Sequence, residues 1–260
     1  MRYVRIFLLH TQEVFEERSR LTVWFLLSWI TPLVLILFWR GAKNLGGWTI
    51  QEIASYYLLV ITMGVFLMSH HEEIIAIRDI QEGGLTAYLL KPFSYFWIRF
   101  FSEISYRFVQ GAIGFLIFFL LIQFFPSYFV FTRSPLILIL SIVIILLSLF
   151  LVFVFKSIMG ILAFWLTDAR GAFEAMGVIL MMFAGYLMPL AFFPMWIQSF
   201  VYYLPFPYMI YFPVIAFEGK LTDVQLFKVI GVEIVWIVTF CILFKKMWHR
   251  GVKKYTGIGQ

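Results

Sequence analysis

The run His70, His71, Glu72 and Glu73 has the side-chain types that bind metal ions. His70 and Glu73 are three residues apart and would share one face of a helix. Protein metal sites usually take three or four ligands, and no second cluster of such residues accompanies this run. We therefore expect no metal site, and we interpret the run as the polar, water-accessible inner end of a membrane helix.

Ionisable residues are sparse inside the apolar stretches. Glu233 lies within one of them, where an ionisable side chain is a candidate for function by default; the alternative is a side chain that reaches interfacial water. Glu103 and Arg107 are four residues apart and can pair along one helix, with Arg99 one turn earlier. A proton relay needs several ionisable groups along the membrane depth, so we interpret these three as a structural anchor.

The common catalytic motifs do not occur in the sequence. There is no G-x-x-x-x-G-K-[ST], so the chain has no phosphate-binding loop of its own, and there is no H-E-x-x-H, G-x-S-x-G or C-x-x-C. The single cysteine, Cys241, cannot form an internal disulfide. We therefore expect no catalytic residues and no cofactor bound by this chain.

Composition indicates a membrane protein. Of 260 residues, 63% are hydrophobic and 13% are charged, and the mean hydropathy is +0.94. A soluble domain is about a quarter charged and about half apolar, so too little polar surface remains here to cover a globule in water. We expect an all-α integral membrane protein.

The apolar runs predict six transmembrane helices in a single domain over residues 1–260, since a crossing needs about 20 mainly apolar residues. An interfacial helix over 1–20 precedes them, because Val4, Phe7, Leu8, Thr11 and Phe15 fall on one side at helical spacing; the alternative is a flexible charged leader. The expected boundaries are 21–39, 53–77, 100–125, 134–165, 173–192 and 224–247 for the six crossings, 78–99 for a polar segment between the second and third, 193–223 for a proline-broken re-entrant segment before the last, and 248–260 for the tail.

The distribution of Lys and Arg predicts the orientation. With six crossings both termini lie on one side, and most of the 20 basic residues fall on that side. The positive-inside rule then places both termini and the segment 78–99 in the cytoplasm. The proline-broken segment 193–223 falls outside the cell.

The stretch RDIQEGGLTAYLLKP, residues 78–92, concentrates charge and turn residues between two apolar runs. Gly83 and Gly84 allow a tight turn, and Leu85 to Leu90 fits a short helix that Pro92 helps to end. An exposed apolar patch ringed by charge is typical of a surface that docks onto another protein. The alternative, which composition alone favours, is a solvated loop with a helix cap.

Several stretches, in order along the chain, resemble the ABC-2 type transporter permeases, and specifically the six-helix ABC-2 family of membrane subunits of bacterial ABC exporters. One departure is Gln260, where that family commonly ends in glycine. The stretches that carry the resemblance are IQEGGLTAYLLKPFSYF, LAFWLTDARGAFEA, GYLMPLAFFPMW, LPFPYMIYFPVIAFEGKL and WHRGVKKYTGIGQ.

The resemblance implies a permease subunit of an ATP-binding cassette exporter, located in the cytoplasmic (inner) membrane of a prokaryote. A separate ATPase would use ATP and Mg and would dock on a coupling segment, in which Leu85, Tyr88 and Leu89 enter a groove of the ATPase. The residues implied for docking are Arg78, Asp79, Glu82, Gly83, Gly84, Leu85, Tyr88, Leu89, Lys91 and Pro92, with second contacts from Glu17, Arg18, Arg20, Asp168 and Arg170.

The resemblance also implies a second permease subunit, and a heterodimer with a sister chain is slightly favoured over a homodimer. Nucleic acid is not an expected partner. The outer segment would form a lid over the pathway, and its residues are Pro205, Pro207, Pro213, Glu218 and Gly219. A pore wall rich in Phe, Met and Leu suits hydrophobic or amphipathic cargo, but drug, lipid, peptide and glycan all stay open.

Three other functions are alternatives. A secondary transporter or channel would need an internal repeat or ionisable groups at mid-membrane. A membrane-embedded enzyme would need clustered catalytic residues, and the run from His70 to Glu73 is the one candidate for such a cluster. A membrane scaffold without transport activity is the third.

Overall fold

The structure is a computed structural model that describes residues 7–12, 30–41, 47–124, 126, 129 and 134–256. Within these residues every regular element is a helix, so the all-α prediction is confirmed for this part of the chain. The first half contains α3 (Ile30–Arg40), α4 (Ile50–Leu67), α5 (His71–Glu73), the π-helix η1 (Ile74–Gln81), α6 (Leu85–Leu89) and α7 (Tyr95–Phe124). The second half contains α8 (Pro135–Ile161), η3 (Leu162–Phe164), α9 (Arg170–Phe183), η4 (Leu190–Phe192), α10 (Met195–Val201), η5 (Phe206–Met209), α11 (Tyr211–Phe217) and α12 (Asp223–Val252).

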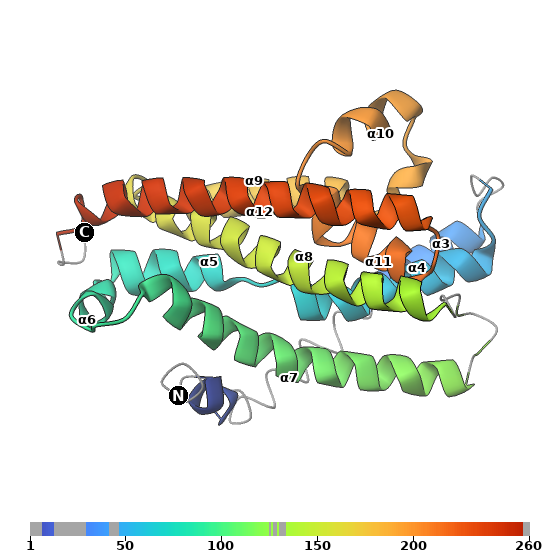
Figure 1. The fold of residues 1–260 in the computed structure, drawn as a ribbon, viewed down its shortest axis with the longest axis horizontal. Coiled ribbons are helices and arrows are strands. Elements are labelled where there is room, and N and C mark those ends of the chain that lie inside the picture. Colours follow the sequence, from blue (N-terminus) through green and yellow to red (C-terminus); the bar gives the residue numbers. More distant parts are fainter. Residues whose placement is uncertain are drawn as a thin grey trace.

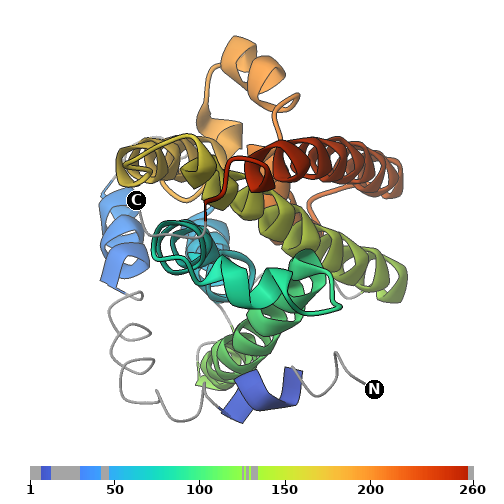
Figure 2. The ribbon, with the colours of Figure 1, turned by 90° about the vertical axis from the view of Figure 1, so that its left-hand side faces the viewer.

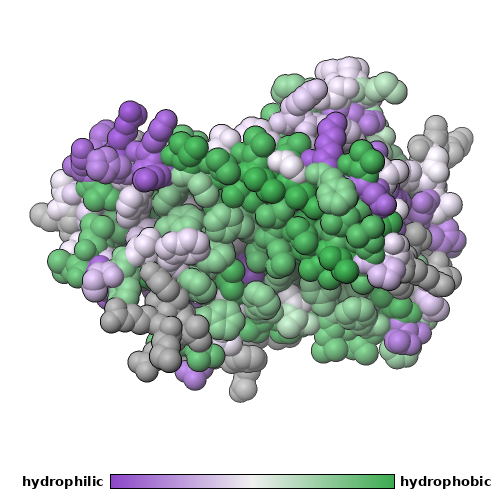
Figure 3. Space-filling model, viewed as in Figure 1, coloured by the Kyte–Doolittle hydropathy of each residue, from purple (hydrophilic) through white to green (hydrophobic). Residues whose placement is uncertain are grey.

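Four helical stretches are long and apolar enough to cross a membrane: Ile50–Gln81, Tyr95–Phe124, Pro135–Phe164 and Asp223–Val252. At 1.5 Å per residue each measures about 45 Å, longer than the roughly 30 Å of bilayer hydrocarbon. Figure 1 shows them side by side along the longest axis, and Figure 3 shows a hydrophobic band on the molecule between hydrophilic ends. The end that carries α6 and the last turns of α12 is called the α6 end below, and the end that carries α3 and α11 is called the opposite end.

Of the other two expected crossings, one is described only in part and one is shorter than predicted. Of the crossing expected over 21–39, the structure describes the second half, where α3 is helical from Ile30 to Arg40, and residues 21–29 lie outside the described residues. The helix expected over 173–192 ends at Phe183, so that α9 has only 14 residues. At about 21 Å it is too short to cross the hydrocarbon alone.

The backbone after α9 leaves the helix because it contacts α4. Gly185 has φ +91°, and a Cβ there would lie 2.5 Å from the Tyr56 hydroxyl. Tyr56 donates a hydrogen bond to the Gly185 carbonyl oxygen at 2.7 Å, and Tyr57 donates one to the Leu187 carbonyl oxygen at 2.8 Å. Irregular backbone inside a membrane protein needs such partners, because lipid offers none.

The core lies around α8. Figure 2 shows this helix crossing the middle of the bundle, and its neighbours in contact include α4, α11 and α12. Its residues from Leu151 to Ile161 are all buried. A helix that is apolar on all faces is typical of such a central position.

The proline-broken segment divides into two parts. In Figure 1, α10 projects from the bundle, and Met195 and Trp196 there are more than 70% exposed. In contrast, η5 and α11 are largely buried against α8 and α4.

Candidate functional site

The segment 78–92 forms a tight turn followed by a short helix at the α6 end. The π-helix η1 closes with hydrogen bonds from Glu82 N to the Ile77 carbonyl oxygen (2.9 Å) and from Gly84 N to the Arg78 carbonyl oxygen (3.2 Å). Gly83 has φ +84°, and a Cβ on Gly84 would lie 2.6 Å from the Arg78 oxygen. The Gly-Gly pair therefore permits a turn that other residues would strain, and α6 begins directly after it.

The exposed face of α6 is not the face that the sequence suggests. Leu85 is 0% exposed and belongs to the hydrophobic core, whereas Leu89 is 43% and Leu90 82% exposed. A side chain packed in the core cannot also enter a groove of a partner. The docking contact expected for Leu85 is therefore corrected: Leu85 fixes α6 to the bundle, and Leu89 and Leu90 are the apolar residues that face outward.

Asp79 is a second expected docking residue that is buried. It forms an ion pair with Arg99 and accepts a hydrogen bond from the Tyr95 hydroxyl, and Asp79 itself is 2% exposed. The guanidinium of Arg99 also lies 4.9 Å from the centre of the Tyr88 ring, a cation–π distance. Asp79 and Arg99 thus join η1 to the start of α7, and their role is to anchor the segment.

The remaining residues of the segment leave an outward face of mixed character. Thr86, Ala87, Leu89 and Leu90 lie among charged groups, and Tyr88 is half-buried. The expected docking residues that are exposed are Arg78, Glu82, Leu89, Lys91 and Pro92.

Two distant parts of the chain join this segment. Gln81 Nε2 donates a hydrogen bond to the Thr167 carbonyl oxygen at 2.9 Å, which places the loop before α9 beside η1. The Tyr255 hydroxyl donates to the Gly83 carbonyl oxygen at 2.7 Å, and Thr86 N donates to the Tyr255 oxygen at 3.2 Å. We call the exposed residues of 78–92, 165–170 and 253–256 the docking surface; Figure 2 looks onto this end of the bundle.

The second contacts implied by the resemblance fall into two groups. Asp168 and Arg170 are exposed on the docking surface, and the Asp168 carboxylate accepts a hydrogen bond from Arg170 N at 2.9 Å. Glu17, Arg18 and Arg20 lie outside the described residues. Of the expected interfacial helix the structure describes residues 7–12, which are helical and contact α7, since Ser105 donates to the Phe7 carbonyl oxygen at 2.9 Å.

The family model for ABC-2 family transporter proteins matches residues 25–259. This range covers nearly the whole chain and includes all three parts of the docking surface. The chain belongs to this family. ABC-2 permeases generally work with an ATPase subunit. A comparison with curated proteins gives no match.

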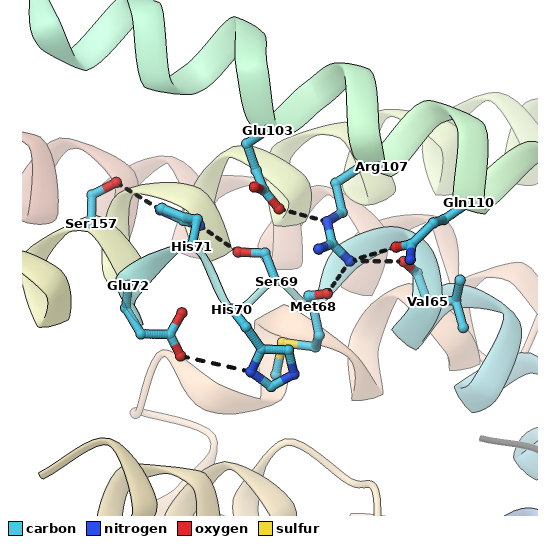
Figure 4. Close-up of polar contacts among 10 residues, drawn as sticks. All are labelled: Val65, Met68, Ser69, His70, His71, Glu72, Glu103, Arg107, Gln110 and Ser157. Carbon is cyan, nitrogen blue, oxygen red and sulfur yellow. Dashed lines mark hydrogen bonds and ion pairs between the residues drawn. The ribbon is translucent and has the colours of Figure 1, made fainter. Parts of the chain in front are cut away.

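The second span of this ABC-2 protein is broken between α4 and α5, and Arg107 from α7 occupies the break (Figure 4). Its Nη1 donates to the carbonyl oxygens of Val65 (3.2 Å) and Met68 (2.5 Å), and its Nε donates to Glu103 Oε1 at 2.6 Å. A helix end leaves carbonyl groups without partners, and in a membrane the protein must supply them. The anchor predicted for Glu103 and Arg107 is therefore observed, with a role that the sequence does not indicate.

The run from His70 to Glu73 follows the break and divides between core and surface. His71 is buried, with Nε2 3.0 Å from Ser157 Oγ, while the His70 side chain is 82% exposed. Glu72 forms a buried ion pair with Lys156 of α8. In the described residues no three metal-capable side chains gather into a site.

Glu233 of the ABC-2 chain is buried in α12 rather than in contact with interfacial water. It is 0% exposed, and Ser148 Oγ of α8 lies 2.8 Å from its Oε1 and 2.7 Å from the Tyr208 carbonyl oxygen. The group thus joins α8, α12 and η5 inside the bundle.

The residues expected in the lid are mostly buried, and η5 packs against α8 inside the bundle. Pro205, Pro207 and Pro213 pack inside, and Gly219 has φ +77° in the turn before α12. Burial raises the pKa of Glu218 to about 8, although Lys220 Nζ, 3.4 Å away, favours the charged form. The part of the segment that projects is α10, and the lid role of the prolines stays a prediction.

Sequence reasoning missed three residues of this arrangement. Leu90 and Leu89 are adjacent, so only the packing of α6 distinguishes them. Lys156 had a detectable signal, because a lone lysine in an apolar helix needs a buried partner. Tyr255 had a weaker signal, as an aromatic residue that directly follows Lys253 and Lys254 in a basic tail. Its contact with Gly83 joins residues 172 positions apart in the sequence.

Proposed function

We propose that this ABC-2 protein is the membrane-spanning permease subunit of an ATP-driven exporter and that a separate ATPase subunit binds its docking surface. The chain itself would carry no catalytic residue and bind no cofactor, and the partner would use ATP and Mg. A second permease subunit, with a sister chain favoured over an identical one, would complete the pathway. The proposed location is the inner membrane of a prokaryote, with six crossings and both termini in the cytoplasm.

The observation that carries the proposal is the convergence of segments 78–92, 165–170 and 253–256 on one surface. Its outward face combines Leu89 and Leu90 with flanking charges of both signs, among them Lys91, Glu82 and Asp168. Apolar anchors within a charged rim are typical of protein interfaces.

The way α6 is held supports a role in transmitting force. Leu85 fixes α6 in the core, and Asp79 with Arg99 joins η1 to α7. A displacement of α6 would therefore move η1 and the inner part of α7 with it. η1 leads through α5 to the break at Met68–His70, which allows the inner part of the second span to tilt relative to α4.

The proposed mechanism is a rigid-body change between two states. Closure of two ATPase subunits on ATP moves the docking surfaces, and the stiff helices carry that motion across the bilayer until the pathway opens outward. The two states would differ in their contacts at the break, where Arg107 donates hydrogen bonds to the carbonyl oxygens of Val65 and Met68.

Replacement of one exposed leucine tests the docking role. Leu90→Asp places a charge at the centre of the exposed apolar face, and we expect co-purification of the ATPase with the membrane protein to fall sharply. Val224→Asp is the matched control, because Val224 is 79% exposed in the first turn of α12, at the opposite end. Retained co-purification with Leu90→Asp, or an equal loss with Val224→Asp, would contradict the proposal.

A further inference from the structure

A groove with a volume of about 470 Å³ lies at the α6 end, between α6, the start of α7 and the last turns of α12. This volume falls within the range of about 300–1,000 Å³ of sites that bind small ligands. Its walls are aromatic and include Tyr88, Phe93, Trp97, Phe244 and Trp248. A space of this size and lining accepts a long apolar ligand.

The charge of the groove is one-sided. Lys245 is its charged lining residue, and none of the described residues that line it is acidic. Lys91 stands beside it, with Nζ 5.3 Å from the centre of the Tyr88 ring. The nearby carboxylate of Asp79 is already paired with Arg99. The groove therefore favours a ligand whose polar end is negative.

The groove also has a defined direction relative to the membrane. Lys245 lies in the last two turns of α12, and Cys241, also in the lining, lies one turn earlier. At 1.5 Å per residue, Cys241 is about 6 Å deeper in the span than Lys245. The cation thus lies toward the aqueous end and the apolar wall extends into the bilayer, with Trp97 and Trp248 at the level where aromatic residues gather at membrane surfaces.

From these contacts we infer that the groove binds one anionic phospholipid from the leaflet at the α6 end. The phosphate lies near Lys245, and an acyl chain follows the aromatic wall past Cys241. Basic pockets between transmembrane helices recognise anionic lipid headgroups in this way. Tyr88 and Leu89 line the groove and also belong to the coupling segment. The bound lipid therefore supports the position of α6. The inference needs only the membrane location of the chain and not the proposed ATPase.

Cys241 provides the test, since it is the single cysteine of the chain. The full chain in uncharged detergent is titrated with phosphatidylglycerol or with phosphatidylcholine of the same acyl chains, and the rate of maleimide reaction at Cys241 is measured. We expect phosphatidylglycerol to slow the reaction at lower mole fraction than phosphatidylcholine. Lys245→Gln should weaken this protection about fivefold, the attraction that one lysine near an anionic lipid contributes.

Two control variants make the result specific. Lys245→Arg keeps the positive charge and should keep the preference. Lys228→Gln removes an exposed lysine near the other end of the same helix and should change nothing. Equal protection by both lipids, no protection by either, or an unchanged preference in Lys245→Gln would overturn the inference. Protection that depends on protein concentration and not on lipid would show that a second copy covers the groove, and would overturn it as well.

Discussion

The Tyr255 hydroxyl donates a hydrogen bond to the carbonyl oxygen of Gly83, 2.7 Å away. The bond connects the C-terminal tail to the turn that sets the direction of α6. The tail is therefore a structural part of the docking surface. Phe164 strengthens this connection, since its ring packs against both Tyr255 and Trp248.

Removal of this hydroxyl should loosen α6 without unfolding the protein. For Tyr255→Phe we expect a loss of about 1 to 3 kcal/mol, because the hydroxyl bonds both the Gly83 carbonyl oxygen and Thr86 N and each such bond usually contributes about 0.5 to 1.5 kcal/mol, and we expect faster amide hydrogen exchange at residues 83–90. Tyr203→Phe is the control, because Tyr203 is 81% exposed beyond α10. Unchanged exchange in Tyr255→Phe would show that the tail does not hold α6.

Leu85 and Leu90 should respond to the same substitution in opposite ways. Leu85→Ala leaves a cavity in the core, and we expect a loss of about 2 to 5 kcal/mol in the free energy of unfolding. Leu90→Ala should change stability by less than about 0.5 kcal/mol, as is usual at the surface, and should weaken ATPase association. Thermal unfolding and co-purification, measured on both variants, separate the two roles. Equal stability losses would mean that α6 packs on its other face.

Arg107 should be costly to replace, because it serves a carboxylate and two carbonyl groups at once. For Arg107→Met we expect a loss of about 3 to 5 kcal/mol, since Glu103 is left as a buried unpaired charge. The double variant Glu103→Gln/Arg107→Met should lose less than the sum of the single variants, with a coupling energy of about 0.5 to 3 kcal/mol. Denaturation of the four proteins in detergent measures the cycle. Additive losses would exclude a direct interaction.

Glu218 should make stability depend on pH. Its pKa of about 8 in the folded protein lies above the ordinary value of 4.5, so between these values the folded state binds a proton that the unfolded state releases. Stability from this group is therefore present below about pH 4.5 and falls as pH rises through 8. In Glu218→Gln this fall should disappear. Melting temperatures from pH 5 to 9 test this, with Asp223→Asn as an exposed control that should keep the wild-type profile.

The sequence alone determined the properties that depend on composition and on neighbouring residues. The hydrophobic fraction requires a lipid environment. The turn at Gly83–Gly84 and the short helix after it depend only on neighbouring residues. The order of the motifs gave the family, which the match over residues 25–259 confirms. The apolar runs also located the four long spans, because length and hydropathy suffice for that.

Only the tertiary structure decided which side chains of these segments face outward. Leu85 and Leu90 look alike in the sequence, but α6 packs on η1 and on Tyr255 of the tail with Leu85 in the core and Leu90 outside. Asp79 is buried because Arg99 and Tyr95 come from the next helix, and Glu233 because Ser148 approaches from α8. Arg107 likewise finds its carbonyl partners at the break in the second span, on a helix other than its own. Burial depends on contacts between residues far apart in the chain, and local pattern carries no information on those contacts.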